Sequence, residues 1–278
     1  MIVFILLLIL VDISSTLHTK VYDCSKSPYL LTKEDYLYNK HIVIEMWSAG
    51  GGGSDYNPDN PSYSYTGGGS GAYVKAFIKT KLSNFNIIVG NGGQKGQAYY
   101  TYVNDKINFI ESISGYSGNY TSFSSTNGEM NIIVMGGESG NIGGNGGYLS
   151  SITGVDKYNT IPGKSSNFCN QQNKYISCGG NAPLGGNGST NYNWVNLHDI
   201  YYLYFGYDGK IPGGGGVGYY IPSSSYNYLN HTSMAGNGAN GLVIVYFDDN
   251  NAIISQANMI YFIYTYYCIM MILIMICH

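Results

Sequence analysis

Glycine is distributed very unevenly along this chain. All 39 glycines lie between Gly50 and Gly241, in runs separated by intervals rich in tyrosine and asparagine. Glycine loses more backbone freedom on ordering than any other residue, so a fold that orders this many must recover the cost elsewhere. The central part of the chain is therefore either a structure built on close glycine backbones, or a set of elements joined by flexible glycine-rich loops. The runs are 50–53, 67–71, 90–96, 136–147, 179–188, 213–218 and 236–241.

The first of these two possibilities is that the glycine runs form helices that pack closely against one another. In an extended helix with three residues per turn, glycine backbones approach closely enough to hydrogen-bond laterally, as they crowd together in collagen. At ~3.1 Å per residue, run 136–147 is expected to form a rod of ~37 Å. Collagen itself is excluded because glycine does not recur at every third position over any long run. Packed rods predict that a Cβ at Gly92, Gly144 or Gly215 destabilises the fold, whereas flexible loops predict an almost neutral change.

Short runs of β-branched and aromatic residues predict strands between the glycine runs. In the first of them, alternation places Ile42, Ile44 and Met46 on one face. No stretch between the first and last glycine runs shows helical periodicity over ten residues, so we predict an all-β domain over residues 41–247, with short strands framing polyglycine-II-like tracts. The predicted strands are 41–48, 72–79, 85–89, 131–135 and 242–247.

The N-terminus carries an unbroken apolar run, residues 2–11. As a helix it is ~15 Å long, half of the ~30 Å hydrocarbon core of a bilayer. With Ser14 and Ser15 behind it, this run predicts a signal peptide over residues 1–15. A buried first strand is the alternative.

The C-terminal segment 259–277 contains no charged residue. At ~28 Å as a helix it is long enough to cross a bilayer, and its aromatics gather in its first half like an interfacial belt. We predict a transmembrane helix, preceded by a lead segment (16–40), the β domain and a juxtamembrane linker (248–258). The alternative is a glycolipid-attachment signal with an acceptor among residues 250–252. The predicted location is a membrane, with the N-terminal domain external or lumenal.

Cysteines and glycosylation sequons bear on the same location. Cys169 and Cys178 are close enough in sequence to close a small disulfide loop in an oxidising compartment. A zinc site is the competing interpretation, but there is no CxxC pair and no nearby pair of histidines. Asn119, Asn187 and Asn230 begin sequons, which predict N-glycosylation on the external side.

Charge and motifs argue against catalysis and nucleic-acid binding. The 13 basic residues are all lysine, and the 16 acids give a net charge of −3, so the arginine forks and basic stripes of nucleic-acid binding are missing. The segment 213–218 satisfies GxGxxG, but Pro212 and Pro222 remove the strand–turn–helix context of a dinucleotide loop. The acids are isolated and the five histidines are scattered. We therefore predict a protein that is not an enzyme, without catalytic, metal or cofactor residues.

Tyrosine supplies the remaining functional signal. It offers a large contact area with little loss of rotamer freedom and a polar tip, as in antibody loops. Tyr201, Tyr202 and Tyr204 are the candidate recognition aromatics, in what we expect to be a loop. The alternative is that these tyrosines pack across glycine backbones.

Four segments in order resemble a known pattern: Ile44-Glu-Met-Trp-Ser-Ala-Gly-Gly-Gly-Gly53, Gly67-Gly-Gly-Ser-Gly-Ala-Tyr-Val74, Ile87-Ile-Val-Gly-Asn-Gly-Gly93 and Gly236-Asn-Gly-Ala-Asn-Gly-Leu-Val-Ile-Val-Tyr246. Together they resemble the glycine-rich domain of bacteriophage tail-fibre and adhesin proteins and of giant-virus surface proteins. A related pattern occurs in the ectodomains of leukocyte-tyrosine-kinase-type receptors. The resemblance implies strands that frame a bundle of polyglycine helices, variable loops that perform recognition, and no catalytic residues. Ser48 stands where a glycine is usual.

These observations together predict a non-enzymatic, membrane-anchored surface glycoprotein with a glycine-rich recognition or coat domain, such as an adhesin or a virion envelope component. The expected partners are the membrane and a cell-surface glycan or protein. A structural spacer without a specific ligand is the alternative. The sequence does not predict an oligomeric state.

Overall fold

The computed structural model describes residues 18–36, 41–54, 66–79, 83–103, 106–168, 176–190, 192–196, 201–219 and 230–247. The predicted signal peptide and the predicted transmembrane helix lie outside these residues. Within the described ranges, no helix combines the length and apolar character needed to cross a bilayer. The regular structure there is almost entirely β, as predicted, with 3-10 turns η1 (Cys24–Lys26), η2 (Lys33–Tyr36) and η4 (Gly140–Ile142).

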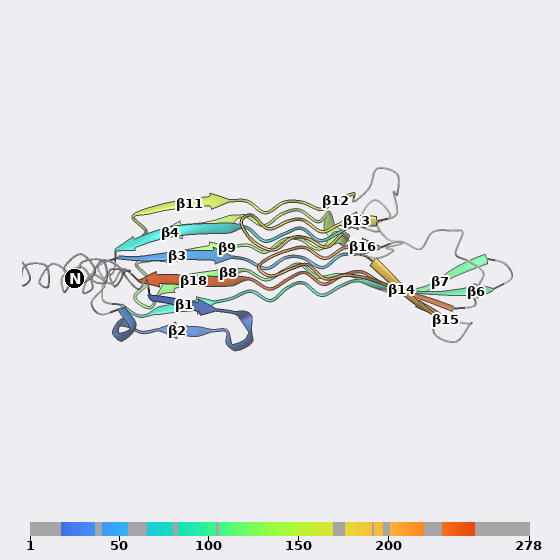
Figure 1. Ribbon diagram of the computed structural model, residues 1–278, viewed down its shortest axis with the longest axis horizontal. Helices are drawn as coiled ribbons and strands as arrows, with labels where there is room; N and C mark the ends of the chain where they lie inside the picture. The colour runs from blue at the N-terminus through green and yellow to red at the C-terminus, as the bar shows by residue number, and fades with distance from the viewer. Residues whose placement is uncertain are drawn as a thin grey trace, which may run out of the picture.

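Two five-stranded sheets form one end of the molecule, called here the sandwich (Figure 1). The first has the order β1 (His18–Tyr22), β18 (Leu242–Phe247), β3 (His41–Trp47), β4 (Tyr73–Lys79) and β11 (Lys157–Ile161). The second has the order β10 (Leu149–Thr153), β9 (Asn131–Val134), β8 (Thr121–Ser125), β5 (Phe85–Ile88) and β2 (Tyr29–Leu31). Neighbouring strands are antiparallel in both sheets.

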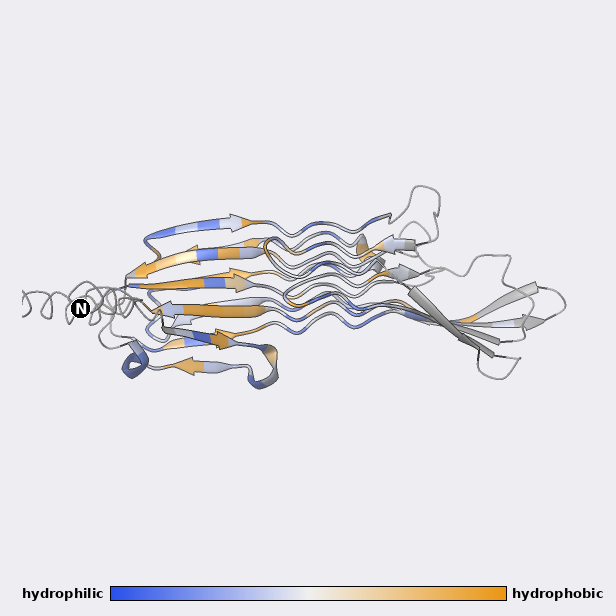
Figure 2. Cartoon of the chain, viewed as in Figure 1, coloured by the Kyte–Doolittle hydropathy of each residue, from blue (hydrophilic) through white to orange (hydrophobic). Residues whose placement is uncertain are grey.

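The hydrophobic core lies between these two sheets. The predicted face of β3 is confirmed, because Ile42, Ile44 and Met46 are each fully buried. Phe123 of β8 faces them in the same cluster, and its ring centroid lies 5.0 Å from that of Phe85. All five predicted strands are present, with bounds that differ by no more than one residue. Figure 2 shows the strongly apolar residues gathered at this end.

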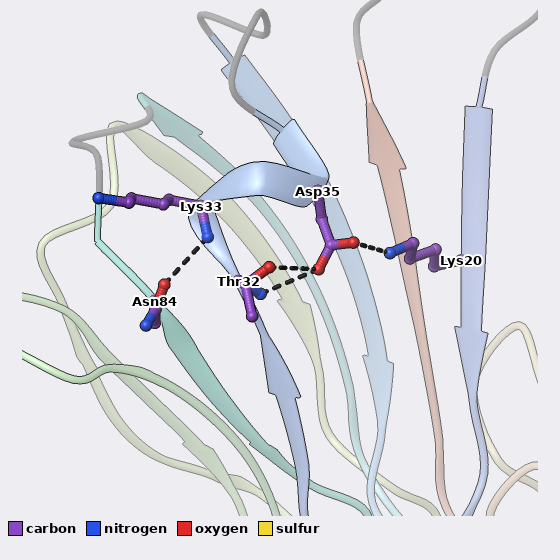
Figure 3. A network of polar contacts seen from close by, with 5 residues as sticks. All are labelled: Lys20, Thr32, Lys33, Asp35 and Asn84. Atoms are coloured by element: carbon purple, nitrogen blue, oxygen red, sulfur yellow. Dashed lines mark hydrogen bonds and ion pairs between the residues drawn. The ribbon is translucent and has the colours of Figure 1, made fainter.

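Residues 18–36 complete the sandwich by adding β1 to the edge of one sheet and β2 to the edge of the other. A polar network fixes this segment (Figure 3). Lys20 of β1 pairs with Asp35 of η2, and Asp35 also accepts the backbone N–H of Thr32 at 2.9 Å. Lys33 donates its backbone N–H to the side-chain oxygen of Asn84, just before β5, at 3.0 Å. The network therefore joins both added strands to the body of the sandwich.

Beyond the sandwich, the chain runs back and forth in extended segments that bond to one another laterally (Figure 1). Among the described residues we distinguish twelve such segments, called here threefold helices. They are 48–54, 66–72, 89–96, 115–120, 135–140, 143–148, 162–166, 178–182, 186–190, 207–210, 212–218 and 235–241.

The hydrogen bonds of segment 48–54 show the period of three that defines a polyglycine II type of helix. The N–H of Gly50 bonds the carbonyl of Ala239, and three residues later the N–H of Gly53 bonds that of Gly236. The carbonyls repeat in the same way, since those of Gly50 and Gly53 accept from Gly93 and Gly96. Every third residue therefore faces the same neighbour.

A threefold helix has three N–H directions and three C=O directions, so it can bond six neighbours. Segment 48–54 does so with 66–72, 89–96, 115–120, 135–140, 212–218 and 235–241. Segments 66–72 and 212–218 likewise bond six neighbours each and also bond each other. These three segments are the centre of the bundle, and the other nine surround them. Central segments leave no direction free for a large side chain, which explains why they contain the longest uninterrupted glycine runs.

Close approach, rather than unusual backbone angles, is what requires glycine in the bundle. A Cβ at Gly215 would collide with the carbonyl oxygen of Gly68, and one at Gly92 with that of Gly238, although neither glycine has a positive φ. The packed alternative is therefore correct and the flexible-loop alternative is wrong for these runs. Gly144 is a poor test of packing, because its φ of +61° would strain any other residue there.

One expectation about the glycine runs is corrected. Run 136–147 is not one long rod: it turns at η4 and folds back, so that Glu138 donates its N–H to the carbonyl of Asn145 at 2.8 Å. The left-handed φ values of Gly143 and Gly144 make this turn possible. Run 179–188 also folds back, with Ala182 bonded to Gly186.

Ser48 fits the bundle although it replaces a glycine. Its side chain is fully buried at the junction of β3 and a central helix. The hydroxyl accepts the N–H of Ala72 at 2.9 Å and donates to the carbonyl of Met135 at 2.7 Å. The extra polar atom is therefore satisfied, and it connects three neighbouring segments.

Two further sheets lie at the far end of the bundle (Figure 1). A small sheet has the order β12 (Asn167–Phe168), β13 (Ile176–Cys178) and β16 (Gly218–Tyr219). A five-stranded sheet, called here the tip sheet, has the order β14 (Tyr192–Asn196), β15 (Tyr201–Gly206), β17 (Asn230–Met234), β6 (Gln97–Val103) and β7 (Lys106–Ile113). Only β15 and β17 run parallel within it.

Candidate recognition surface

The threefold helices position the tip sheet directly, because each of its strands continues one of them in the chain. Segment 89–96 runs into β6, and β7 returns into segment 115–120. Strand β17 continues into segment 235–241, which ends at β18 in the sandwich. A bundle bonded laterally along its length therefore holds the tip sheet away from the sandwich (Figure 1).

Backbone register fixes which residues of the tip sheet share a face. Tyr204 is paired with Trp194 on one side and Ser233 on the other, and Ser233 with Ala98. The next row contains Asn196, Tyr202, His231, Tyr100 and Phe109. Paired residues lie on the same face and residues two apart along a strand share it, so the two rows belong to one face.

The aromatic residues are concentrated on this face, called here the aromatic face. It holds Tyr100, Tyr102, Phe109, Tyr192, Trp194, Tyr202 and Tyr204, with Asn196, Ser112, His231 and Ser233 between them. At the described paired positions of the opposite face, the aromatics are Tyr99, Tyr201 and Phe205, and the charged residues are Lys106 and Glu111. The aromatic face has no Lys, Asp or Glu at any paired position.

The structure changes the interpretation of the three candidate tyrosines. Tyr201, Tyr202 and Tyr204 lie in strand β15 and not in a loop, because β15 is paired on both sides. Tyr202 and Tyr204 belong to the aromatic face and Tyr201 to the opposite one. The aromatic content of this segment favours a strand as well as a recognition loop.

Trp194 and Tyr100 were not among the predicted recognition residues. The aromatic and β-branched content of 192–196 and 97–103 is the signal that would have favoured strands there. Strand β14 pairs with β15, which follows it closely in the chain, whereas β6 joins the sheet by pairing with β17, more than half of the domain away in sequence.

The other predicted site residues are dispersed. Cys178 in β13 is disulfide-bonded, whereas its predicted partner, Cys169, lies outside the described residues. Cys24 is a free thiol in η1. Asn119 and Asn187 are exposed on peripheral threefold helices, and Asn230 is the first residue of β17. Glycosylation at these positions stays a prediction.

The described residues offer little else for chemistry. They contain no cluster of three His, Cys, Asp or Glu residues that could hold a metal ion. A small open pocket lies at the sandwich end, lined by residues that include Ile78, Phe85, Met130 and Glu129. The segment 213–218, which resembles a dinucleotide loop in sequence, is a central threefold helix whose N–H groups bond other backbones.

A family model described as a glycine-rich domain matches residues 35–248. The chain belongs to this glycine-rich domain family. The match covers most of the chain and spans the bundle, the tip sheet and all the sandwich strands except β1 and β2. No curated protein matches the chain.

The motifs that suggested a glycine-rich domain are structural. The opening block forms β3 and a central helix, 48–54, and the closing block forms a peripheral helix, 235–241, and β18. Trp47 of the opening block is buried, and its indole N–H bonds the carbonyl of Pro183 at 2.9 Å. The motifs of the glycine-rich domain therefore form the strands and the threefold helices at the junction of the sandwich and the bundle.

Proposed function

We propose that this glycine-rich domain is a non-enzymatic recognition module of a membrane-anchored surface protein, with the tip sheet as its binding end. The observation that carries the proposal is the concentration of aromatic residues on one face of a sheet held at the end of a laterally bonded bundle. Tyrosine and tryptophan dominate the binding energy of many recognition surfaces because they combine area, rigidity and a polar group.

The bundle supports this proposal by its stiffness. The backbone N–H groups of Gly50, Gly51, Gly52 and Gly53 each bond a different neighbouring segment or a different turn of one. Bending the bundle would break several such bonds together. Because unpaired buried backbone groups are costly, a surface at the tip is presented in a fixed geometry, which lowers the ordering cost of binding.

The proposed location is external or lumenal, with anchoring through segment 259–277 as an adhesin or envelope-like protein. Strand β18 ends at the sandwich, on the opposite end from the tip sheet (Figure 1), so an anchor that follows it directs the tip away from the membrane. Protease treatment of intact cells or particles tests this: cleavage from outside is expected, and protection of the domain would contradict it.

Binding of the purified full chain to arrays of cell-surface glycans and proteins tests recognition. We expect saturable binding that is lost when Tyr201, Tyr202 and Tyr204 are replaced together by Ala, with the melting temperature retained. The rival is a structural spacer, in which no array component binds saturably.

A further inference from the structure

The sandwich presents one apolar and one polar outer face, the outer faces being those turned away from the core. We propose that the outer face of the first sheet is the contact surface of a homodimer, in which two copies of this chain pack side by side. This inference goes beyond recognition at the tip. Its choice of a second copy as the occupant rests in part on the membrane anchoring proposed above.

Strand register defines the outer face of the first sheet. In β3 the side chains of Val43, Glu45 and Trp47 alternate with the fully buried core residues, so they point outward. Residues paired with them across the sheet share that face. Val21 is 63 % exposed and Phe77 is 39 % exposed, so this face is open along both of its sides. Its aliphatic and phenyl side chains are Val21, Val43, Phe77, Ile161, Leu242 and Ile244.

The outer face of the second sheet has the opposite character. Leu30, Ile88 and Ile133 are its apolar residues, and none of its paired outward positions is aromatic. A solvated face of an antiparallel sheet is normally polar. The second sheet follows this rule and the first does not, although both belong to one sandwich. The polar outward residues of the second sheet are Asn86, Ser122, Ser124, Asn131, Ser151 and Thr153.

The polar positions of the first face are arranged as in a protein interface. Thr19, Lys157 and Asn159 lie on the edge strands β1 and β11. Glu45 and Lys75 lie further in, but they bond each other at 2.9 Å. Interfaces combine an apolar centre with a polar rim. Because the central charges are paired within each copy, two such faces can meet without an unpaired like charge between them.

Leu184 extends the apolar surface onto the bundle. It lies in the turn after Ala182, which packs in a cluster with Trp47 at the end of β3. Leu184 is 73 % exposed and has a φ of +51°, so its backbone and its surroundings both favour glycine or asparagine. Ile211, also exposed, lies in the adjoining turn, which is bonded to Gly186. Contiguous exposed apolar side chains of this kind mark interaction surfaces.

The size of the face suits a dimer. Five strands ~4.8 Å apart and three rows of outward residues ~6.8 Å apart cover about 24 Å by 20 Å. This is roughly 500 Å² in projection, and the relief of the side chains and the two turns add to it. A standard specific interface buries ~800 Å² on each partner. The face is therefore of the order that a stable dimer needs.

Anchoring favours a second copy as the occupant. The sandwich is the end of the molecule at which β18 ends, opposite the tip sheet (Figure 1). Chains anchored in one membrane through segment 259–277 hold their sandwiches at the same height, so each copy meets the same face of its neighbours. Confinement to a membrane also raises the effective concentration of that face. A dimer formed in this way presents both tips in the same direction.

Sedimentation of the purified full chain in a mild nonionic detergent, over a series of protein concentrations, tests the proposal. We expect a reversible equilibrium between monomer and dimer. A monomer at every concentration would overturn the dimer, whether or not the face binds another protein or lipid.

Charged and polar variants locate the interface. Val21→Lys and Leu184→Asn should each raise the dimer dissociation constant by about tenfold or more, the cost typical of a central contact. Leu30→Lys is the matched control, because Leu30 is also an exposed apolar residue of an edge strand, but on the outer face of the second sheet. It should change the constant by less than about threefold.

A dimer that survives Val21→Lys combined with Leu184→Asn would lie elsewhere on the chain and would overturn the assignment to this face. Melting temperatures separate lost association from lost folding. Should Val21→Lys fail to fold, Leu184→Asn still decides, since asparagine tolerates a positive φ.

The outcome is independent of recognition at the tip. A monomeric chain that binds an array component saturably would overturn the dimer and leave the recognition function standing. A dimer that binds no array component would do the reverse.

Discussion

Trp47 donates its indole N–H to the backbone carbonyl oxygen of Pro183, and the two atoms lie 2.9 Å apart. Trp47 ends β3 on the outer side of the sandwich, whereas Pro183 lies in the turn between two peripheral threefold helices. The Trp47 ring also packs on Tyr73, with ring centroids 4.9 Å apart. The sandwich and the bundle are therefore joined by a specific side chain as well as by the continuous backbone.

The first prediction removes that link. Trp47→Phe keeps an aromatic ring but leaves the carbonyl of Pro183 without its donor, and a shortened ring leaves space in a buried cluster. We expect a loss of ~1–3 kcal/mol in the free energy of unfolding, measured by chemical denaturation. Tyr158→Phe, at a half-exposed ring of β11, is the control and should be within about 0.5 kcal/mol of the unmodified protein.

The second prediction concerns close packing in the bundle. Gly215→Ala places a methyl group against the carbonyl of Gly68, in a central helix whose backbone cannot move without breaking bonds to Gly180 and Ser189. We expect a loss of ~3 kcal/mol or more, at the upper end of the cost of overpacking, seen as a clear fall in melting temperature.

Gln94→Ala is the control for Gly215→Ala. Gln94 is exposed on a peripheral threefold helix, so its side chain is expected to contribute little. An unchanged melting temperature for Gly215→Ala would contradict the packed bundle.

The third prediction tests a buried hydroxyl. The Oγ1 atom of Thr121 accepts the N–H of Gly90 at 3.1 Å and donates to the carbonyl of Trp47 at 3.0 Å. Thr121→Val keeps the shape but leaves both groups unpaired, which should cost ~1–3 kcal/mol for each. Thr121→Ser restores the hydroxyl and should recover most of the stability. Equal stability of the Val and Ser variants would argue against these bonds.

The fourth prediction is a dependence of stability on pH. Burial raises the pKa of Glu45, but hydrogen bonds from Lys75 at 2.9 Å and Tyr246 at 3.1 Å lower it, and the net pKa is below the ordinary value of 4.5. The unfolded chain therefore binds the proton more readily than the folded one. The stabilisation is complete above pH 4.5 and is lost as the pH falls through the lower pKa of the folded state.

Glu45→Gln should flatten the fall in melting temperature on acidification below pH 4.5. Lys75→Met should reduce the same slope, since it removes the main hydrogen bond to the carboxylate. An acid slope unchanged in Glu45→Gln would show that other groups account for it.

Local patterns predicted much of the sandwich. Strands β3 and β18 were predicted because their sequences alternate between residues that are buried and residues that are more exposed, as in segment 42–46. Strands β6, β14 and β15 were missed as strands because tyrosine is mixed with both polar and apolar residues along them, so that neither a polar nor an apolar face stands out.

The candidate recognition residues were predicted only in part. Tyr202 and Tyr204 were identified by composition. Trp194 joins them through pairing with the next strand along the chain, and Tyr100 joins them only through β17, a strand distant in sequence. Which residues cluster on one face of a sheet depends on the register in which its strands pair. That register depends on the neighbouring strands, which the local sequence does not identify.

By itself, the sequence determined that the glycines belong to one domain, that short strands frame them and that no long helix interrupts them. It did not determine whether the glycine runs are packed or flexible, because an extended glycine backbone has the same local preference in both cases. Tertiary structure decided that question: the N–H of Gly50 is satisfied only by Ala239, almost at the other end of the domain. Lateral hydrogen bonds between distant segments, and the close approach that only a missing Cβ allows, are what convert the glycine runs into a bundle.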